Sequence, residues 1–108
     1  MKRTPMKRVN RRRKDREWAR AYGSPERVRW VKNQPCFVCG VVPSENAHLR
    51  TGGTGRKADA NLVAALCKRH HTGPEGYDDH KATFEQTHNI NLAQLAADLE
   101  RRWQEENR

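Results

Sequence analysis

Two short cysteine and histidine motifs constrain this 108-residue chain more than any other feature. Cys36 and Cys39 form a C-x-x-C pair, and Cys67 and His70 form a C-x-x-H pair, with 27 residues between Cys39 and Cys67. Two intervening residues let a tight turn direct both side chains toward one ion, and two such pairs complete a closed tetrahedral Zn²⁺ site. The sequence therefore predicts a structural zinc site at these four residues. Gly40 follows the first pair, where a tight turn often requires a positive φ.

The small apolar content of the chain supports a metal rather than a disulfide framework. Only 34% of the residues are hydrophobic, so a core of this size needs a staple such as a metal. Three cysteines cannot all pair, and a redox role for Cys36 and Cys39 would require a βαβ context that we do not expect here. No apolar run reaches the roughly 20 residues that span a bilayer. With no recognisable signal peptide, we expect a cytoplasmic protein without a membrane partner.

The positive charge is concentrated at the amino-terminal end. Residues 1–35 contain 13 Lys or Arg and three Asp or Glu, a net charge of +10, whereas residues 36–108 contain nine and ten, a net charge of −1. A basic segment attached to a near-neutral remainder is typical of nucleic-acid-binding proteins. We predict phosphate contacts from Arg11, Arg12 and Arg13. The alternative is a tail that only confers solubility.

The predicted organisation has three parts: a basic disordered tail (1–11), a basic helical extension (12–35) and a zinc-containing domain with a carboxy-terminal helix (36–108). The elements expected are helices at about 12–22 and from 25, strands at 45–50 and 62–66, a helix near 67–71 that resumes by 79, and a last helix after Asn89 or Asn91. Trp18, Trp30 and Trp103 are expected in the core and His88 at the surface.

The last predicted helix has one apolar stripe. Its members, spaced alternately by three and four residues, are Leu92, Leu95, Ala96, Leu99 and Trp103. The stripe packs either on the domain or on a second copy in a homodimer, and the sequence leaves both open.

Three more residues lie between or beside the predicted zinc ligands in the sequence. They are His48 in a predicted strand, Asn61 six residues before Cys67, and His71 directly after the ligand His70. With their surroundings, AHLRTGGTG at 47–55 and NLVAALCKRHH at 61–71, they resemble the HNH endonucleases of the ββα-metal (His-Me finger) superfamily. The resemblance extends over about residues 36–81 and is greatest to small members encoded by bacteriophages and prophages. It implies an α+β fold, in which a ββα-metal core of hairpin and helix surrounds the zinc between flanking helices.

The resemblance also implies a role for each residue. His48 would be the general base that takes a proton from the water attacking the phosphorus, a task suited to imidazole near neutral pH. His71 and His80 would hold a catalytic divalent cation (Mg²⁺, Mn²⁺, Ni²⁺ or Zn²⁺), with Asp78 and Asp79 as alternative ligands beside His80. Asn61 would orient the loop that carries His48. The nearby Arg50, Arg56 and Lys57 would contact phosphates from the glycine-rich loop.

The function expected from these features is metal-dependent hydrolysis of phosphodiester bonds in double-stranded DNA, by nicking or double-strand cleavage. The basic third would hold the duplex by its phosphates. A phage-type member would work with a partner in phage DNA processing, within the cytoplasm of a bacterial host. The alternative is a non-catalytic zinc-stabilised nucleic-acid-binding module, because Ala47 stands where many family members carry a metal-binding Asp or His. RNA is a weaker option, since no aromatic-rich sheet signature is present.

Overall fold

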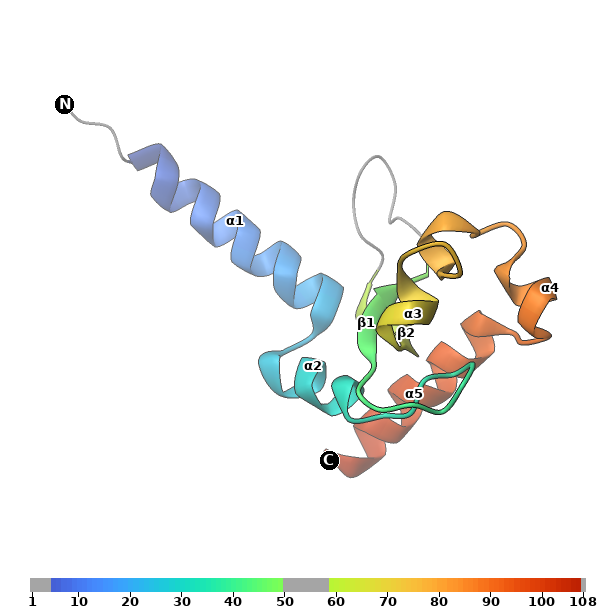
Figure 1. Ribbon diagram of the computed structural model, residues 1–108. Coiled ribbons are helices and arrows are strands. Elements are labelled where there is room, and N and C mark those ends of the chain that lie inside the picture. Colours follow the sequence, from blue (N-terminus) through green and yellow to red (C-terminus); the bar gives the residue numbers. More distant parts are fainter. Residues whose placement is uncertain (1–4, 50–58, 108) are drawn as a thin grey trace.

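The computed structural model describes residues 5–49 and 59–107, and within them the chain is α+β with one small antiparallel sheet (Figure 1). The elements, in order, are α1 (Pro5–Tyr22), α2 (Pro25–Lys32), β1 (Glu45–His48), the 3-10 turn η1 (Ala60–Leu62), β2 (Val63–Leu66), α3 (Lys68–His71), the 3-10 turn η2 (Tyr77–Asp79), α4 (Phe84–His88) and α5 (Leu92–Glu106). Both predicted strands and the small α+β architecture are confirmed. In the described part of the chain, no helix combines the length and apolar character needed to cross a bilayer.

The two strands separate two clusters of buried side chains. Glu45 pairs with Leu66 and His48 with Val63 in the antiparallel register. Because successive strand residues point to opposite faces, Ala47, Ala64 and Leu66 lie together on one face with Cys36, Cys67, Tyr77 and Phe84. Val63 and Ala65 lie on the other face with Val31 and Leu99. One face of the hairpin is therefore the metal-motif side and the other is the side of α2.

Side-chain caps explain where two of the helices begin. The Ser24 side chain accepts a hydrogen bond from the backbone N–H of Arg27 at the start of α2, and Pro25 occupies the first turn. The Asn91 side chain accepts in the same way from the N–H of Gln94 at the start of α5. Both helix starts are as predicted. On α5, Leu92, Ala96 and Leu99 are buried in the domain, which accounts for most of the predicted apolar stripe.

Two predictions of local structure are corrected. Helix α1 begins at Pro5 and not at about residue 12, so residues 5–11 are helical. This segment has no apolar periodicity, but Arg and Lys are good helix formers and proline is tolerated in a first turn. After α3 the chain does not resume an α-helix at Asp79; it makes the turn η2 and enters α4 only at Phe84.

An ion pair that no local pattern indicates joins α2 to α5. Arg27 is only 2% exposed, and its Nε and Nη2 atoms donate to one carboxylate oxygen of Glu100, at 3.1 and 2.7 Å. The two residues are 73 positions apart in the sequence. Arg27 therefore belongs to the packing of the domain, although its charge contributes to the basic third.

Candidate metal centre and the predicted catalytic residues

Cys36, Cys39, Cys67 and His70 come together in the structure with all four ligand atoms within 4.8 Å of one another. The Sγ atoms of Cys39 and Cys67 are 3.7 Å apart, and Nδ1 of His70 lies 3.3 Å from Sγ of Cys67 and 3.7 Å from Sγ of Cys36. Metal–sulfur bonds of about 2.3 Å at tetrahedral angles imply sulfur separations of about 3.8 Å. The predicted cluster therefore fits one tetrahedral metal ion, and its Cys₃His donor set is consistent with zinc.

The pKa shifts of the cysteine thiols favour the binding of a cation in the cluster. Burial acts to raise the pKa of Cys36, but N–H groups of Cys67, Cys39 and Val38 outweigh it, and the pKa is lowered. The pKa of Cys67 is raised, first by burial and also by the neighbouring sulfur atoms. Thiolates at this separation repel one another, so a cation between them is what allows all three to ionise. Gly40, with φ of 77°, makes the turn after the first pair as predicted.

His70 is the buried histidine of the cluster, and a second ring supports it. Burial lowers the pKa of His70, which keeps the imidazole neutral, the form that binds a metal. The ring of His88 packs edge-on against His70 with centroids 5.4 Å apart, and the same ring contacts Phe84 at 4.5 Å. His88 is half-buried, so the prediction that it lies at the surface holds only in part. A helix of five residues gave no periodicity from which this inward face could be read.

His71 points away from the cluster, as its position beside His70 suggests. Its Nδ1 lies 2.8 Å from a carboxylate oxygen of Glu45 on β1, and its Nε2 lies 3.6 Å from a carboxylate oxygen of Asp78 in η2. A carboxylate can only accept here, so Nδ1 carries a proton, and in the neutral ring Nε2 carries the lone pair. This is the carboxylate–histidine arrangement that orients many metal ligands. Glu45 was not among the predicted site residues, although it lies on the same strand face as Ala47.

His48 is held by the amino-terminal helix. Its Nε2 lies 2.6 Å from the backbone carbonyl oxygen of Ala21, and its ring meets the ring of Tyr22 edge-on, with centroids 4.8 Å apart. Because a carbonyl only accepts, Nε2 carries a proton, and in the neutral ring the lone pair is on Nδ1. The contact with α1 was not predicted.

The structure separates the predicted catalytic residues by the two faces of β1. Asn46 and His48 contact the carbonyl oxygens of Val28 and Ala21, on the side of α2 and α1. Glu45 contacts His71 on the side of α3. Glu45 and His48 are also three residues apart on β1, a distance of about 10 Å along the strand. Within the described residues, the only cluster of three or more metal-ligating side chains is the Cys₃His group, so His48, His71 and His80 do not form a common ligand group there.

The remaining predicted site residues lie apart from these. His80 is exposed, and its Nε2 donates to the carbonyl oxygen of Pro74 at 2.6 Å. Asn61 is exposed in η1, and no hydrogen bond of its side chain is found among residues 5–49 and 59–107. Arg12 and Arg13 are exposed on α1, whereas the Arg11 side chain and the whole of Arg50, Arg56 and Lys57 lie outside the described residues.

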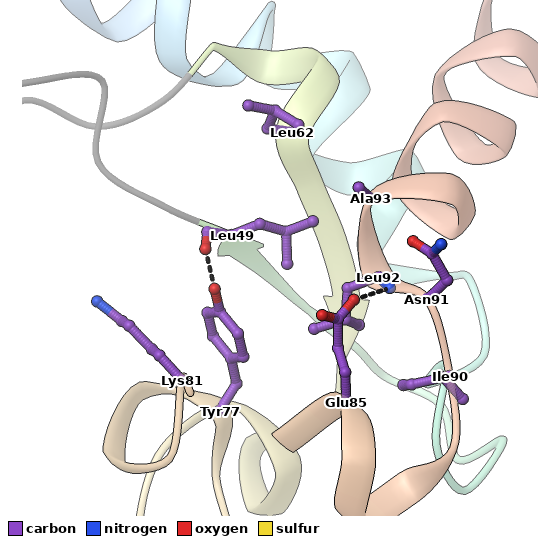
Figure 2. A pocket seen from close by; sticks show the side chains of 9 residues that line it. All are labelled: Leu49, Leu62, Tyr77, Lys81, Glu85, Ile90, Asn91, Leu92 and Ala93. Atoms are coloured by element: carbon purple, nitrogen blue, oxygen red, sulfur yellow. Dashed lines mark hydrogen bonds between the residues drawn. The ribbon is translucent and has the colours of Figure 1, made fainter. Parts of the chain in front are cut away.

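A pocket of about 340 Å³ lies beyond the end of β1, and none of the residues that line it is a histidine (Figure 2). Its lining residues are Leu49, Leu62, Tyr77, Lys81, Glu85, Ile90, Asn91, Leu92 and Ala93. The Tyr77 hydroxyl donates to the carbonyl oxygen of Leu49, and the Glu85 carboxylate accepts from the N–H of Leu92 at 2.6 Å. The Tyr77 hydroxyl and the Glu85 carboxylate are therefore both engaged in hydrogen bonds to the backbone that stabilise the fold.

Comparison with known proteins places the chain in a family. Over 47 residues it is 45% identical to "Uncharacterized protein YdfU" of Escherichia coli (strain K12). That match covers 41% of this chain and 14% of YdfU, so the matched part is a small fraction of the longer protein. No solved structure matches the chain. The family described as "Protein of unknown function (DUF968)" matches residues 4–104, and the chain therefore belongs to this family.

Proposed function

We propose that the chain is a zinc-stabilised, metal-dependent endonuclease of the HNH type that hydrolyses DNA phosphodiester bonds. One observation carries the proposal: each motif histidine has one ring nitrogen fixed by an acceptor, His48 by Ala21 and His71 by Glu45. A general base and a metal ligand both need the opposite nitrogen to carry the lone pair in a set direction. A phage or prophage origin, a phage DNA-processing partner and a homodimer remain predictions.

The structural role falls to zinc at Cys36, Cys39, Cys67 and His70. These side chains come from the loop before β1 and from the start of α3, directly after β2, so one ion would hold together the two strand ends at the open end of the hairpin. In a domain this small, the binding free energy of the metal is a large share of the folding free energy.

The chemical step falls to His48. Its Nδ1 would take a proton from a water whose oxygen bonds to phosphorus, and the bond from phosphorus to the leaving 3′ oxygen would break. Imidazole, with an ordinary pKa of about 6.5, can accept that proton near neutral pH. The hydrogen bond to Ala21 keeps the ring from turning and fixes which nitrogen accepts.

His71 and Asp78 would hold the catalytic divalent cation. The Nε2 atom of His71 and the Asp78 carboxylate lie 3.6 Å apart, a separation that two ligands of one ion can adopt. A divalent cation bound there supplies positive charge to the phosphate oxygens during hydrolysis. Asp78 thus takes the place that the sequence assigned to His80, whose Nε2 is engaged with Pro74.

A second candidate function is the non-catalytic nucleic-acid-binding module. The observation that favours it is the placement of His48 and Glu45-bound His71 on opposite faces of β1. In that case both histidines only stabilise the fold, and no catalytic metal is bound because Ala47 has no ligand atom in its side chain.

A supercoiled-plasmid assay separates the two. Wild type, His48→Ala, Asp78→Asn and the neighbouring control Asp79→Asn are compared in Mg²⁺, Mn²⁺, Ni²⁺ and Zn²⁺, with an EDTA arm. The nuclease predicts metal-dependent nicked or linear DNA that is lost in His48→Ala and Asp78→Asn and retained in Asp79→Asn. Cleavage that persists in His48→Ala would refute the mechanism. A plasmid that shifts on a gel and is not cut with any metal would establish the binding module.

A further inference from the structure

We infer that α1 carries a stacking platform for an unpaired nucleobase, made by Trp18 lying on Tyr22 beside His48. The platform would direct the site toward DNA that contains single-stranded segments. The inference rests on the proposed function, because it names the class of DNA that His48 would act on.

The platform is defined by two ring contacts. Trp18 stacks on Tyr22 with centroids 5.3 Å apart and an angle of 30° between the planes, and Tyr22 meets the imidazole of His48 edge-on at 4.8 Å. The two aromatic residues are one helical turn apart, so they lie in one row on α1. A base added to Trp18 would extend this stack and bring its own phosphate to the neighbourhood of His48.

Trp18 differs from the other tryptophans, and the prediction that all three lie in the core is wrong for it. Trp30 and Trp103 contact each other at 5.5 Å, and Trp30 packs against the cluster around Val31 and Leu99. Trp18 belongs to neither buried cluster and is 40% exposed although Tyr22 covers part of it. Tryptophan is enriched at binding interfaces, and the exposed part of this indole can accept a further ring.

The charge around Trp18 identifies the occupant as a nucleic acid strand. Helix α1 contains eight Lys or Arg and two Asp or Glu, and it projects from the rest of the molecule (Figure 1). Its residues 12–19 are exposed, and Lys14 lies one turn before Trp18 in the same row. Basic side chains interleaved with an aromatic ring bind single strands by holding phosphates and stacking bases. A duplex, whose bases are already stacked, could use the charge and not the ring.

Fluorescence anisotropy with two labelled probes tests the platform: a 20-nucleotide oligothymidine and a 20-base-pair duplex of mixed sequence. Binding is measured without added divalent cation, so that no cleavage occurs. Trp18→Leu should weaken binding of the single strand about tenfold and of the duplex less than twofold. Trp18→Phe, which keeps a ring, should retain single-strand binding within about threefold. Since Trp18 is exposed, circular dichroism and thermal melting should be unchanged in both variants.

An abasic 20-nucleotide strand sharpens the test, because it keeps the phosphates and removes the bases. Wild type should bind it about tenfold more weakly than oligothymidine, and Trp18→Leu should cause no further loss. Equal losses for single strand and duplex, or a loss with the abasic strand, would overturn the platform. Tighter binding of oligouridine than of oligothymidine would overturn the assignment to DNA.

The outcome is distinguishable from that of the nuclease proposal. A chain that binds single strands through Trp18 and never cuts DNA would refute the nuclease and keep the platform as a binding site. A chain that cuts plasmid through His48, with Trp18→Leu neutral in the anisotropy assay, would refute the platform alone.

Discussion

The Nε2 atom of His48 lies 2.6 Å from the backbone carbonyl oxygen of Ala21, so the last residue of β1 is tied to the last turn of α1. Ala21 is buried at this junction, and Tyr22 packs against the same imidazole. The basic helix therefore determines the tautomer and the orientation of a residue on the hairpin. Helix α1 is part of the candidate site as well as a carrier of charge.

Truncation of α1 at two points should separate these roles. Removing residues 1–11 keeps the carbonyl of Ala21, so the rate of plasmid cleavage at saturating DNA should change by less than about threefold. Removing residues 1–22 deletes that acceptor and should lower the saturated rate at least tenfold, because His48, the proposed general base, loses its orientation. Equal saturated rates for the two truncations, at equal metal content, would contradict a role for Ala21.

Loss of the metal should unfold the hairpin side of the domain. Elemental analysis should find one zinc per chain, and Cys36→Ser or Cys67→Ser should abolish it. Apparent zinc binding free energies of about 10–16 kcal/mol exceed or match the net stability of most small domains, so both variants and the chelated protein should lose their thermal transition. His88→Ala is the matched control: it removes the ring that contacts His70 and leaves all four ligands, so it should retain zinc.

Acidification should weaken the same region through His70. Burial lowers the pKa of His70 in the folded chain below the ordinary value of about 6.5. The unfolded chain then binds a proton more readily than the folded one, so the stability contributed is present above pH 6.5 and is lost as the pH falls through the lower folded pKa. Thermal melts at pH 7.5, 6.5 and 5.5 should show a falling midpoint, and His80→Gln, at an exposed position, should leave that trend unchanged. A melting midpoint that rises toward pH 5.5 would contradict this prediction.

Breaking the Arg27–Glu100 ion pair should lower the free energy of unfolding more than removal of any exposed charge on α5 does. Glu100→Ala leaves the guanidinium of Arg27, which is 2% exposed, without its carboxylate. An uncompensated buried charge costs about 3 kcal/mol or more in unfolding free energy. Urea denaturation should detect this loss. Glu105→Ala, on the exposed side of the same helix, should change stability by less than about 0.5 kcal/mol.

The features that sequence reasoning located correctly depend on local chemistry. Ser24 and Asn91 cap their helices, the two strands lie where predicted, and the Cys₃His spacing identifies the candidate metal ligands without reference to the rest of the chain. Such signals are contained within a few residues, so a single sequence carries them.

The features that it missed depend on pairs far apart in the chain. No local pattern connects Arg27 to Glu100, or Glu45 to His71 across 26 positions. The sequence predicts disorder over the first part of α1, because a helix without an apolar face gives no periodicity. One miss was avoidable: strand alternation from the buried Ala47 places Glu45 on the α3 side and His48 on the other.

The salt dependence of DNA binding tests whether α1 contacts phosphates. Each Lys or Arg on a phosphate of duplex DNA contributes about −0.9 to the slope of log K against log salt, because it releases a condensed counterion. Arg12→Ala combined with Arg13→Ala should therefore make the slope less negative by about 2 if both side chains contact phosphates. The matched control is Arg101→Ala combined with Arg102→Ala on α5, which removes the same charge from a helix outside the basic third. If both double variants shift the slope equally, net charge alone attracts the DNA; a change confined to Arg12 and Arg13 assigns the contact to α1.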